Sequence, residues 1–345
     1  MRPFRLGFTA LVLWLGGTLP AQGVAVQPSP LKGFAGQDLL VRAWKAQNQV
    51  AYRGFRLYFF DFGQGKRLQE ERVAVRPNGK GGVDFRLDLT AILDSKGRNG
   101  GVINLTLAQA LFSLREGSNF RYRGFHIHNL DLALRNYDVI LQGNDVVASR
   151  PCRVIFVAPK AKDRRAWKVW LDGETGLVLK YLEISPEGKT VAGMEMEAQS
   201  FQIGKNVAFQ DIRKWWRPSG ASHVFKTLGE AEQAFGAPAL VPSYLPPGYM
   251  LMEVRVARDT WKHSFLVLKY TDGIDTFSVI EGLPAPGAVG KGPFSPGGQN
   301  PPPPVIHRYR LGCLTQLWTT VEGRMIMMVG RMSPDEVPLV FQTLL

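Results

Sequence analysis

Residues 166–184 carry the clearest alternation of hydrophobic and polar positions in the chain. Trp167 and Val169 stand two positions apart, which is the period of a strand. The stretch 172–176, Asp-Gly-Glu-Thr-Gly, then supplies turn chemistry, because Asp can hydrogen-bond the backbone two residues on and Gly176 can adopt a left-handed conformation. Alternation resumes after this stretch. The pattern predicts a β-hairpin over 166–184.

The apolar segments on either side of the hairpin predict a sheet. An amphipathic helix is expected over 37–49, where Leu40, Ala43 and Trp44 lie at helical spacing. No crossover helix is expected between most of the strands, which favours antiparallel pairing. Strands are expected over 50–62, 69–76, 83–89, 148–159 and 191–203.

The segment 94–136 interrupts this succession of strands. A loop is expected over 95–101, and Leu107, Leu111 and Leu114 then fall on one face of an expected helix.

A second set of elements follows a stretch rich in Trp and Pro at 213–220. A short helix is expected over 227–235, and a closing helix over 334–345 with Ser333 as its N-cap. A Pro- and Gly-rich loop occupies 287–304. Strands are expected over 252–257, 264–270, 276–281, 306–311, 314–321 and 324–330.

Together these patterns predict an α+β protein with two domains. The chain without its first residues exceeds 300 residues, which is more than one core usually supports. Residues 28–211 are expected to form a large curved antiparallel sheet closed by helices. A linker over 212–241 then leads to a small α+β domain over 242–345.

The first 25 residues have the pattern of a secretory signal peptide. Arg2 and Arg5 precede an apolar run over 6–17, and small residues follow at Ala21 and Ala25. An uncleaved anchor is the alternative, but spanning a bilayer takes about 20 apolar residues. We expect an exported, periplasmic protein, cleaved after either Ala21 or Ala25.

The composition is that of a globular protein, with 45% hydrophobic and 21% charged residues. The formal net charge is +13, and it falls to +11 once Arg2 and Arg5 leave with the signal peptide. Outside the cytoplasm such a charge favours anionic lipid, glycolipid or an acidic protein domain over nucleic acid. A basic surface that only faces solvent is an equally valid interpretation.

The chain has two cysteines, Cys152 and Cys313, each in an apolar, strand-like run. Export permits a disulfide between them. Because the two positions fall in different expected domains, two buried free thiols are favoured.

The chemistry-bearing residues do not form a recognisable catalytic or metal site. His126 and His128 alternate in an expected strand and would share one face, but a metal normally requires three or four ligands. There is no Gly-x-Ser-x-Gly nucleophile elbow. The expected site therefore has no catalytic residue, no metal and no cofactor, and an enzyme is the least favoured class of function.

The order of several short motifs resembles a known family. The hairpin has the Trp-x-Asp-x-x-Thr-Gly-Leu character of periplasmic proteins with the lipoprotein-carrier (LolA-like) fold. With the later motifs, the chain resembles the RseB/MucB family, periplasmic regulators of the sigma-E envelope stress response. The motifs are Trp170–Leu177, Leu245–Tyr249, Tyr270–Ile274, Phe277–Val279 and Gly323–Gly330.

This resemblance implies a binding protein with two partners. It implies that the chain binds the periplasmic part of a transmembrane anti-sigma factor and shields it from proteolysis. Amphiphilic lipid or lipopolysaccharide entering the protein would release that partner. A plain lipid or lipoprotein carrier is the alternative, although a carrier needs only the curved sheet. The sequence leaves a homo-oligomer open.

Lipid would bind on an apolar inner face of the curved sheet, where burial of acyl chains is favourable by roughly 0.8 kcal/mol per methylene. Basic residues at the mouth of such a cavity would favour a phosphorylated head group. The alternative is that the same side chains simply form core. The lipid-cavity candidates are Phe55, Leu57, Phe59, Phe85, Leu87, Trp167 and Val169.

Overall fold

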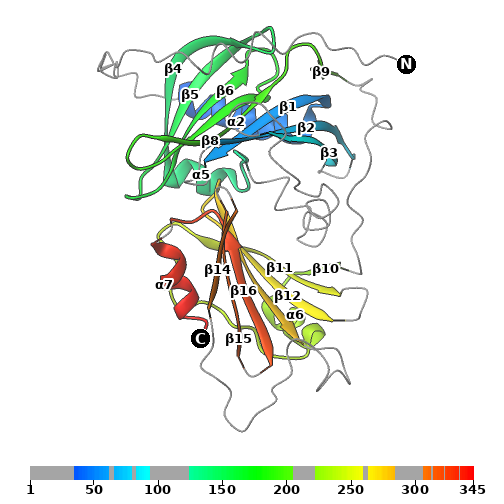
Figure 1. Ribbon diagram of the computed structural model, residues 1–345, viewed down its shortest axis with the longest axis vertical. Coiled ribbons are helices and arrows are strands. Elements are labelled where there is room, and N and C mark those ends of the chain that lie inside the picture. Colours follow the sequence, from blue (N-terminus) through cyan, green and yellow to red (C-terminus); the bar gives the residue numbers. More distant parts are fainter. Residues whose placement is uncertain are drawn as a thin grey trace.

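The computed structural model contains two sheets, one in each half of the chain (Figure 1). The residues it describes are 35–61, 66–79, 83–93, 124–204, 222–258, 263–283, 306–311, 314–321, 323–333 and 335–345. The large antiparallel sheet with few helices and the smaller α+β unit confirm the expected fold class.

The first sheet has the strand order β3-β2-β1-β8-β7-β6-β5-β4, and every neighbouring pair is antiparallel. The short β9 pairs with one end of β1. The strands are β1 (Tyr52–Asp61), β2 (Lys66–Pro77), β3 (Val83–Leu93), β4 (Tyr137–Val147), β5 (Arg150–Pro159), β6 (Ala166–Asp172), β7 (Val178–Ile184), β8 (Thr190–Met196) and β9 (Gln202–Ile203).

The first sheet is strongly curved, because one helix reaches strands near both of its ends. Helix α2 (Ala35–Gln49) contacts β2 and also β4, which lie on opposite sides of the sheet order. Its buried residues Leu40, Ala43 and Ala46 join the core of this domain. A flat sheet of this width could not meet a single helix in this way, so the sheet folds around α2 as a half-barrel.

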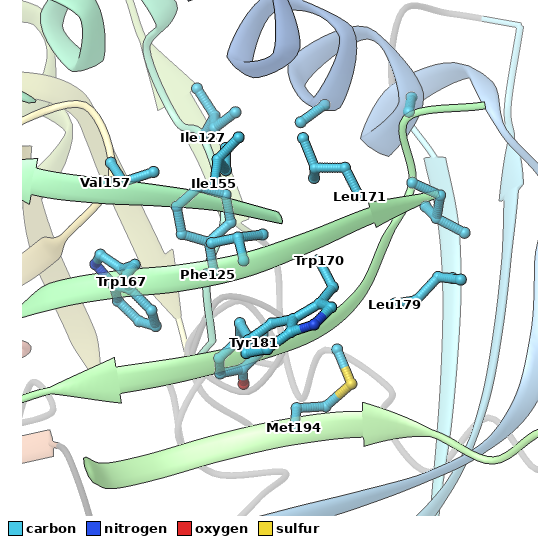
Figure 2. Close-up of a cluster of buried hydrophobic side chains, with 14 of the residues drawn as sticks. Phe125, Ile127, Ile155, Val157, Trp167, Trp170, Leu171, Leu179, Tyr181 and Met194 are labelled. Atoms are coloured by element: carbon cyan, nitrogen blue, oxygen red, sulfur yellow. The ribbon is translucent and has the colours of Figure 1, made fainter. Parts of the chain in front are cut away.

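Aromatic side chains fill the core between the strands and α2 (Figure 2). The fully buried Trp167 lies edge-on to Phe125 and to Tyr181, with ring centroids 5.5 and 5.6 Å apart. Edge-to-face packing of this kind adds to the area that the rings bury. The expected hairpin of β6 and β7 is confirmed, and it supplies the centre of this core.

The second sheet has the order β10-β11-β12-β13-β16-β15-β14, also antiparallel throughout. Helices α6 (Leu228–Phe235) and α7 (Glu336–Gln342) both pack into the core of this domain, through Phe235 and Phe341 among others. The strands are β10 (Ser222–Phe225), β11 (Met250–Arg258), β12 (Ser264–Thr271), β13 (Thr276–Leu283), β14 (His307–Leu311), β15 (Leu314–Val321) and β16 (Arg324–Gly330).

The two domains meet where helix α5 (Leu130–Asn136) lies against the turn between β12 and β13 (Figure 1). The carbonyl of Gly273 in this turn accepts hydrogen bonds from the backbone N–H groups of His128 and Asn129, at 2.8 and 3.2 Å. Gly273 has φ +111°, and a Cβ there would lie 2.2 Å from the backbone nitrogen of Ala133. Only glycine allows this approach.

The next residue of the same turn, Ile274, belongs to the core of the first domain although it comes from the second. It is 2% exposed. At the junction, the two domain surfaces are in contact, and the Ile274 side chain of the second domain is also inserted into the core of the first.

Residues 124–129 do not form the strand expected around His126 and His128. They form an irregular segment that precedes α5, a helix the sequence did not predict. The reason is that the Gln47 side chain satisfies both backbone groups of Ile127, accepting from its N–H at 3.1 Å and donating to its carbonyl at 2.6 Å. The two His rings still lie together, with centroids 4.7 Å apart.

Two further expectations differ in their bounds. The stretch expected as a linker over 212–241 contains β10 and α6, and the Thr227–Glu230 capping box begins α6. The closing helix begins at Glu336 rather than at 334, because the N–H groups of Glu336 and Val337 bond to the carbonyl of Ser333 in a preceding turn.

Several expectations fall outside the described residues. These are the signal peptide over 1–25, the helix around Leu107–Leu114, the loop over 287–304 and the environment of Cys313.

Replacing Ile274 by Ala should lower the free energy of unfolding by about 3 kcal/mol, because it opens a cavity in a core that both domains share. Chemical denaturation followed by circular dichroism measures this quantity. Ile140→Ala is the matched control, since Ile140 is 38% exposed on the first sheet, and its effect should stay below about 0.5 kcal/mol. Equal losses in the two variants would mean that Ile274 does not plug the first domain.

Candidate functional site

The register of the first sheet divides the seven lipid-cavity candidates between its two faces. Residues directly opposite each other in paired strands point to the same face. Phe85 pairs with Val75 and Leu87 with Val73, whereas Trp167 pairs with Val157 and Val169 with Ile155. All four partners are buried on the face that meets α2, which we call the core face.

The other three candidates, Phe55, Leu57 and Phe59, lie on the opposite side, the outer face. Leu57 pairs with Glu70 and Glu195, residues that alternate with the buried positions of β2 and β8. The ring of Phe59 lies over Gly193, where an added Cβ would stand 2.5 Å from its Cε1 atom. The structure therefore does not bring the seven candidates together.

The core-face candidates differ in exposure. Trp167 and Val169 are 0% exposed and packed among other side chains, whereas Phe85 and Leu87 are half-buried at the β3 end of the sheet. The β3 end is thus the part of the core face where an apolar ligand has the shortest path to these candidates.

A buried polar cluster lies on the core face beside Phe85. The Arg56 guanidinium is 2.7 Å from Glu71, and Gln69 donates to the same carboxylate at 2.6 Å. The Arg56 Cζ atom lies 6.0 Å from the centre of the Phe85 ring. Because Glu71 is 0% exposed, its charge needs this partner. The cluster places one cationic group at the half-buried end of the core face.

At the opposite end, the core face reaches the second domain. The guanidinium of Arg331, which follows β16, lies 4.5 Å from the centre of the Trp167 ring. The same guanidinium donates to Glu183 of β7, a fully buried carboxylate. Trp167 and Glu183 are opposite each other in the register of β6 and β7. One side chain of the second domain therefore contacts both.

Glu183 is one member of a chain of buried charges, which we call the junction cluster. Arg165 and Arg331 both pair with Glu183, and Arg331 also lies 3.3 Å from Asp275. Arg164 lies 3.5 Å from Asp272 and 3.1 Å from Glu336. The cluster consists of Arg164, Arg165, Glu183, Asp272, Asp275, Arg331 and Glu336.

Neutral hydrogen bonds complete the junction cluster. The Tyr137 hydroxyl donates to Asp272 at 2.7 Å, and the Asn136 amide donates to the carbonyls of Gly248 and Asp272 at 3.0 and 2.8 Å. The Arg164 guanidinium also lies 5.0 Å from the ring of Tyr249. Three side chains of the first domain thus hold atoms of the second.

Burial is the largest influence on the pKa values of Asp275 and Asp272. It raises the pKa of Asp275 to about 7, although the charge of Arg331 opposes the shift. Burial also raises the pKa of Asp272, against the hydrogen bond from Tyr137. The pKa of Tyr137 rises well above its usual value for the same reason, and the neighbouring Asp272 charge adds to it.

Asp172, at the turn of the central hairpin, has the opposite behaviour. Its burial alone would raise its pKa, but hydrogen bonds from Arg150 and Thr175 outweigh this and lower the pKa. Arg150 Nε lies 2.6 Å from one carboxylate oxygen, and the Thr175 hydroxyl donates to the other at 2.6 Å. This carboxylate fixes the turn that the sequence motif predicted.

The described residues hold no group of three or more His, Cys, Asp or Glu side chains arranged for a metal ion. Cys152 is buried with a free thiol, and burial raises its pKa to about 11. None of the helices in the described part of the chain is long and apolar enough to cross a bilayer.

Sequence reasoning missed the junction cluster. Asp272 lies in the motif Tyr270–Ile274 and Arg331 directly follows the motif Gly323–Gly330, but neither motif indicates that these side chains are paired across domains. Glu183 did carry a usable indication, because it continues the buried alternation of Leu179 and Tyr181 with a charged residue. A charge at an inward position indicates a buried partner from elsewhere.

Asp172→Asn should lower the free energy of unfolding at pH 7 by about 2–3 kcal/mol, because it removes a buried ion pair. The pKa of Asp172 is lowered in the folded chain, so its contribution is present above the unfolded pKa of about 3.9 and is lost as pH falls further. The difference from the parent chain should therefore shrink below about pH 4. Denaturation at several pH values tests this, with the exposed Glu174→Gln as control; a difference independent of pH would contradict it.

Comparison with known proteins supports the interpretation of the fold. The family model for the MucB/RseB N-terminal domain matches residues 97–215. A curated relative, the sigma factor AlgU regulatory protein MucB of Pseudomonas aeruginosa, is 29% identical over 146 residues. That match covers 42% of this chain and 43% of the relative, so the alignment spans less than half of its length.

The similarity in structure extends further than the similarity in sequence. MucB in complex with MucA(peri) matches with a TM-score of 0.51 and 20% identity, covering 88% of this chain and 96% of that chain. MucB alone gives the same TM-score with 21% identity, covering 89% and 96%. Both domains are included in these matches. Residues 97–215 thus match the model of the MucB/RseB N-terminal domain, and the chain shares the fold of MucB over most of its length.

Proposed function

We propose that this protein is a periplasmic regulator of envelope stress signalling. It binds the periplasmic part of a transmembrane anti-sigma factor and shields that segment from proteolysis. Binding of lipid or lipopolysaccharide to this protein releases the anti-sigma factor. Its function is binding rather than catalysis.

The observation that carries this proposal is the two-domain similarity to MucB. The relative is named as a regulatory protein of the sigma factor AlgU, and the matched structure is of MucB in complex with MucA(peri). The alignment of folds spans both domains of this chain, so a surface built from both is available for a similar partner.

The proposed release has a thermodynamic requirement. A ligand shifts an equilibrium only by the difference between its affinities for the two states. Lipid must therefore bind the free protein more tightly than the complex, and the partner must weaken lipid binding by the same factor.

The core face is the better of the two candidate surfaces for lipid. Its candidates Phe85 and Leu87 are half-buried and apolar, which suits an acyl tail, and Arg56 beside Phe85, already paired with Glu71, can still donate to an anionic head. On the outer face, Leu57 lies between Glu70 and Glu195, the second of which is paired with Lys180, so no unpaired cation adjoins Leu57 in these pairs.

A lipid or lipoprotein carrier is the second candidate function. The half-barrel of the first domain alone would be sufficient for a carrier function. The ion pairs that bury Glu183, Asp272 and Arg331 between the two domains favour a function that uses both.

The regulator is tested by capture of a partner. The mature chain should retain the periplasmic segment of the single-pass membrane protein encoded beside it, and added lipopolysaccharide or phospholipid vesicles should release that segment. Retention that lipid does not affect would refute the release step. Lipid binding without any retained protein would favour the carrier.

The proposed lipid-binding surface is tested by a substitution that places a larger side chain on it. Leu87→Trp should weaken lipid binding tenfold or more, because it adds bulk at the half-buried end of the core face. Leu57→Trp is the matched control on the outer face and should leave lipid affinity unchanged. Binding of a fluorescent fatty acyl probe measures both. A stronger effect of the Leu57 variant would assign lipid to the outer face.

A further inference from the structure

The junction cluster contains one more negative charge than positive charges. The ion pairs join four carboxylates, Glu183, Asp272, Asp275 and Glu336, to three guanidinium groups. The side chains are 0–18% exposed, so water compensates the excess poorly. A buried group of this kind is stabilised when it takes up one proton.

The geometry indicates which carboxylate holds the proton. Asp272 accepts from the Tyr137 hydroxyl at 2.7 Å and from the backbone N–H groups of Ile274 and Asp275 at 3.0 and 2.8 Å. These bonds stabilise the ionised form. Glu183 pairs with two guanidinium groups, and Glu336 lies at the rim.

Asp275 is the least compensated of the four. Its nearest cation is the Arg331 Nε atom at 3.3 Å, and no group among the described residues donates a hydrogen bond to its Oδ1 atom. The other ionisable groups that act on it are Asp272, Glu183 and Arg165. Tyr137 and Tyr249, both buried and neutral, and Arg164 with Glu336 complete the surroundings of the pair.

The turn that carries this carboxyl lies in the contact between the domains. The turn is held by the N–H groups of His128 and Asn129, Gly273 lies against Ala133, and Ile274 enters the first core. Separation of the domains exposes the turn to water. The environment of Asp275 therefore changes with docking.

We propose that the domain junction is a proton-dependent latch, in which the Asp275 carboxyl takes up a proton when the two domains dock. Docking then tightens as pH falls and loosens as pH rises. The latch requires neither lipid nor an anti-sigma factor, so it stands independently of the proposed function.

The direction of the pH dependence follows from the linkage between proton binding and docking. In the separated state Asp275 is expected to have the ordinary aspartate pKa of about 3.9, and in the docked state burial raises the pKa to about 7. The stabilisation of the docked state by this proton is complete below the pKa of the separated state, and it is lost as pH rises to the pKa of the docked state. With one proton taken up, the docking constant should fall about tenfold per pH unit within this window.

Hydrogen exchange of the full chain between pH 5 and 8 tests the latch. The backbone amides of His128 and Asn129 donate across the junction, so their protection, corrected for intrinsic exchange, reports its opening. We expect this protection to fall about tenfold per unit from pH 5 to 7 and to level off above. The Gly236 amide, which bonds within α6, is an internal reference without this slope.

The decisive variant is Asp275→Asn, which keeps the shape and removes the titration. Its protection at His128 and Asn129 should lose most of the slope between pH 5 and 7, and Asp84→Asn, in an exposed ion pair, should keep the parent slope. A flat profile in the parent chain, or an equal slope in Asp275→Asn, would overturn the proposal. If that variant does not fold, carbon NMR titration of the Asp275 carboxyl in the parent chain decides: a midpoint near 7 supports the latch and one near 4 refutes it.

Discussion

The arrangement of this protein depends on how charge is buried between its two domains. Glu183 and Asp272 come from different domains and are both 0% exposed. A buried carboxylate without a partner is strongly destabilising. Asp272 has its ion-pair partner in the other domain, and Glu183 has one partner in its own domain, Arg165, and one in the other. Arg331 and Arg164 are the partners that pair across the junction. The relative position of the domains is therefore specified by pairing, because sliding one domain past the other would leave several charges unpaired at once.

The same junction connects the interior of the first domain to the second. Arg331 lies against the ring of Trp167, the side chain at the centre of the first core, and pairs with Glu183 beside it. Any ligand that moves Trp167 must also move Arg331 or break its contacts. Two sites couple when both bias one element with two arrangements. The Trp167–Arg331 contact is the physical place where the core face and the domain arrangement could influence each other.

The sequence predicted the individual strands and helices well, but it did not predict how they pack against one another. The hairpin of β6 and β7 follows from a period of two and from turn chemistry, both of which are local. The division of Phe55 and Leu57 from Phe85 and Leu87 is not local, because the register between strands decides which face is buried. The pairing of charges in the junction cluster is not local either, so the sequence did not predict it. Asp272 and Gly273 have the composition of any tight turn, and only the position of α5 turns them into a docking element.

The junction also bears on the choice between a carrier and a regulator. A carrier needs to bind and release an apolar ligand, which the half-barrel could do alone, and burying ion pairs against a second domain adds no ligand surface. Buried ion pairs are seldom the most stabilising way to fill an interface, since apolar residues of similar volume often stabilise as well or better. What they provide here is a single docking geometry for Gly273 and Ile274. A fixed geometry between two domains is useful to a protein whose partner contacts both, as we propose for the regulator.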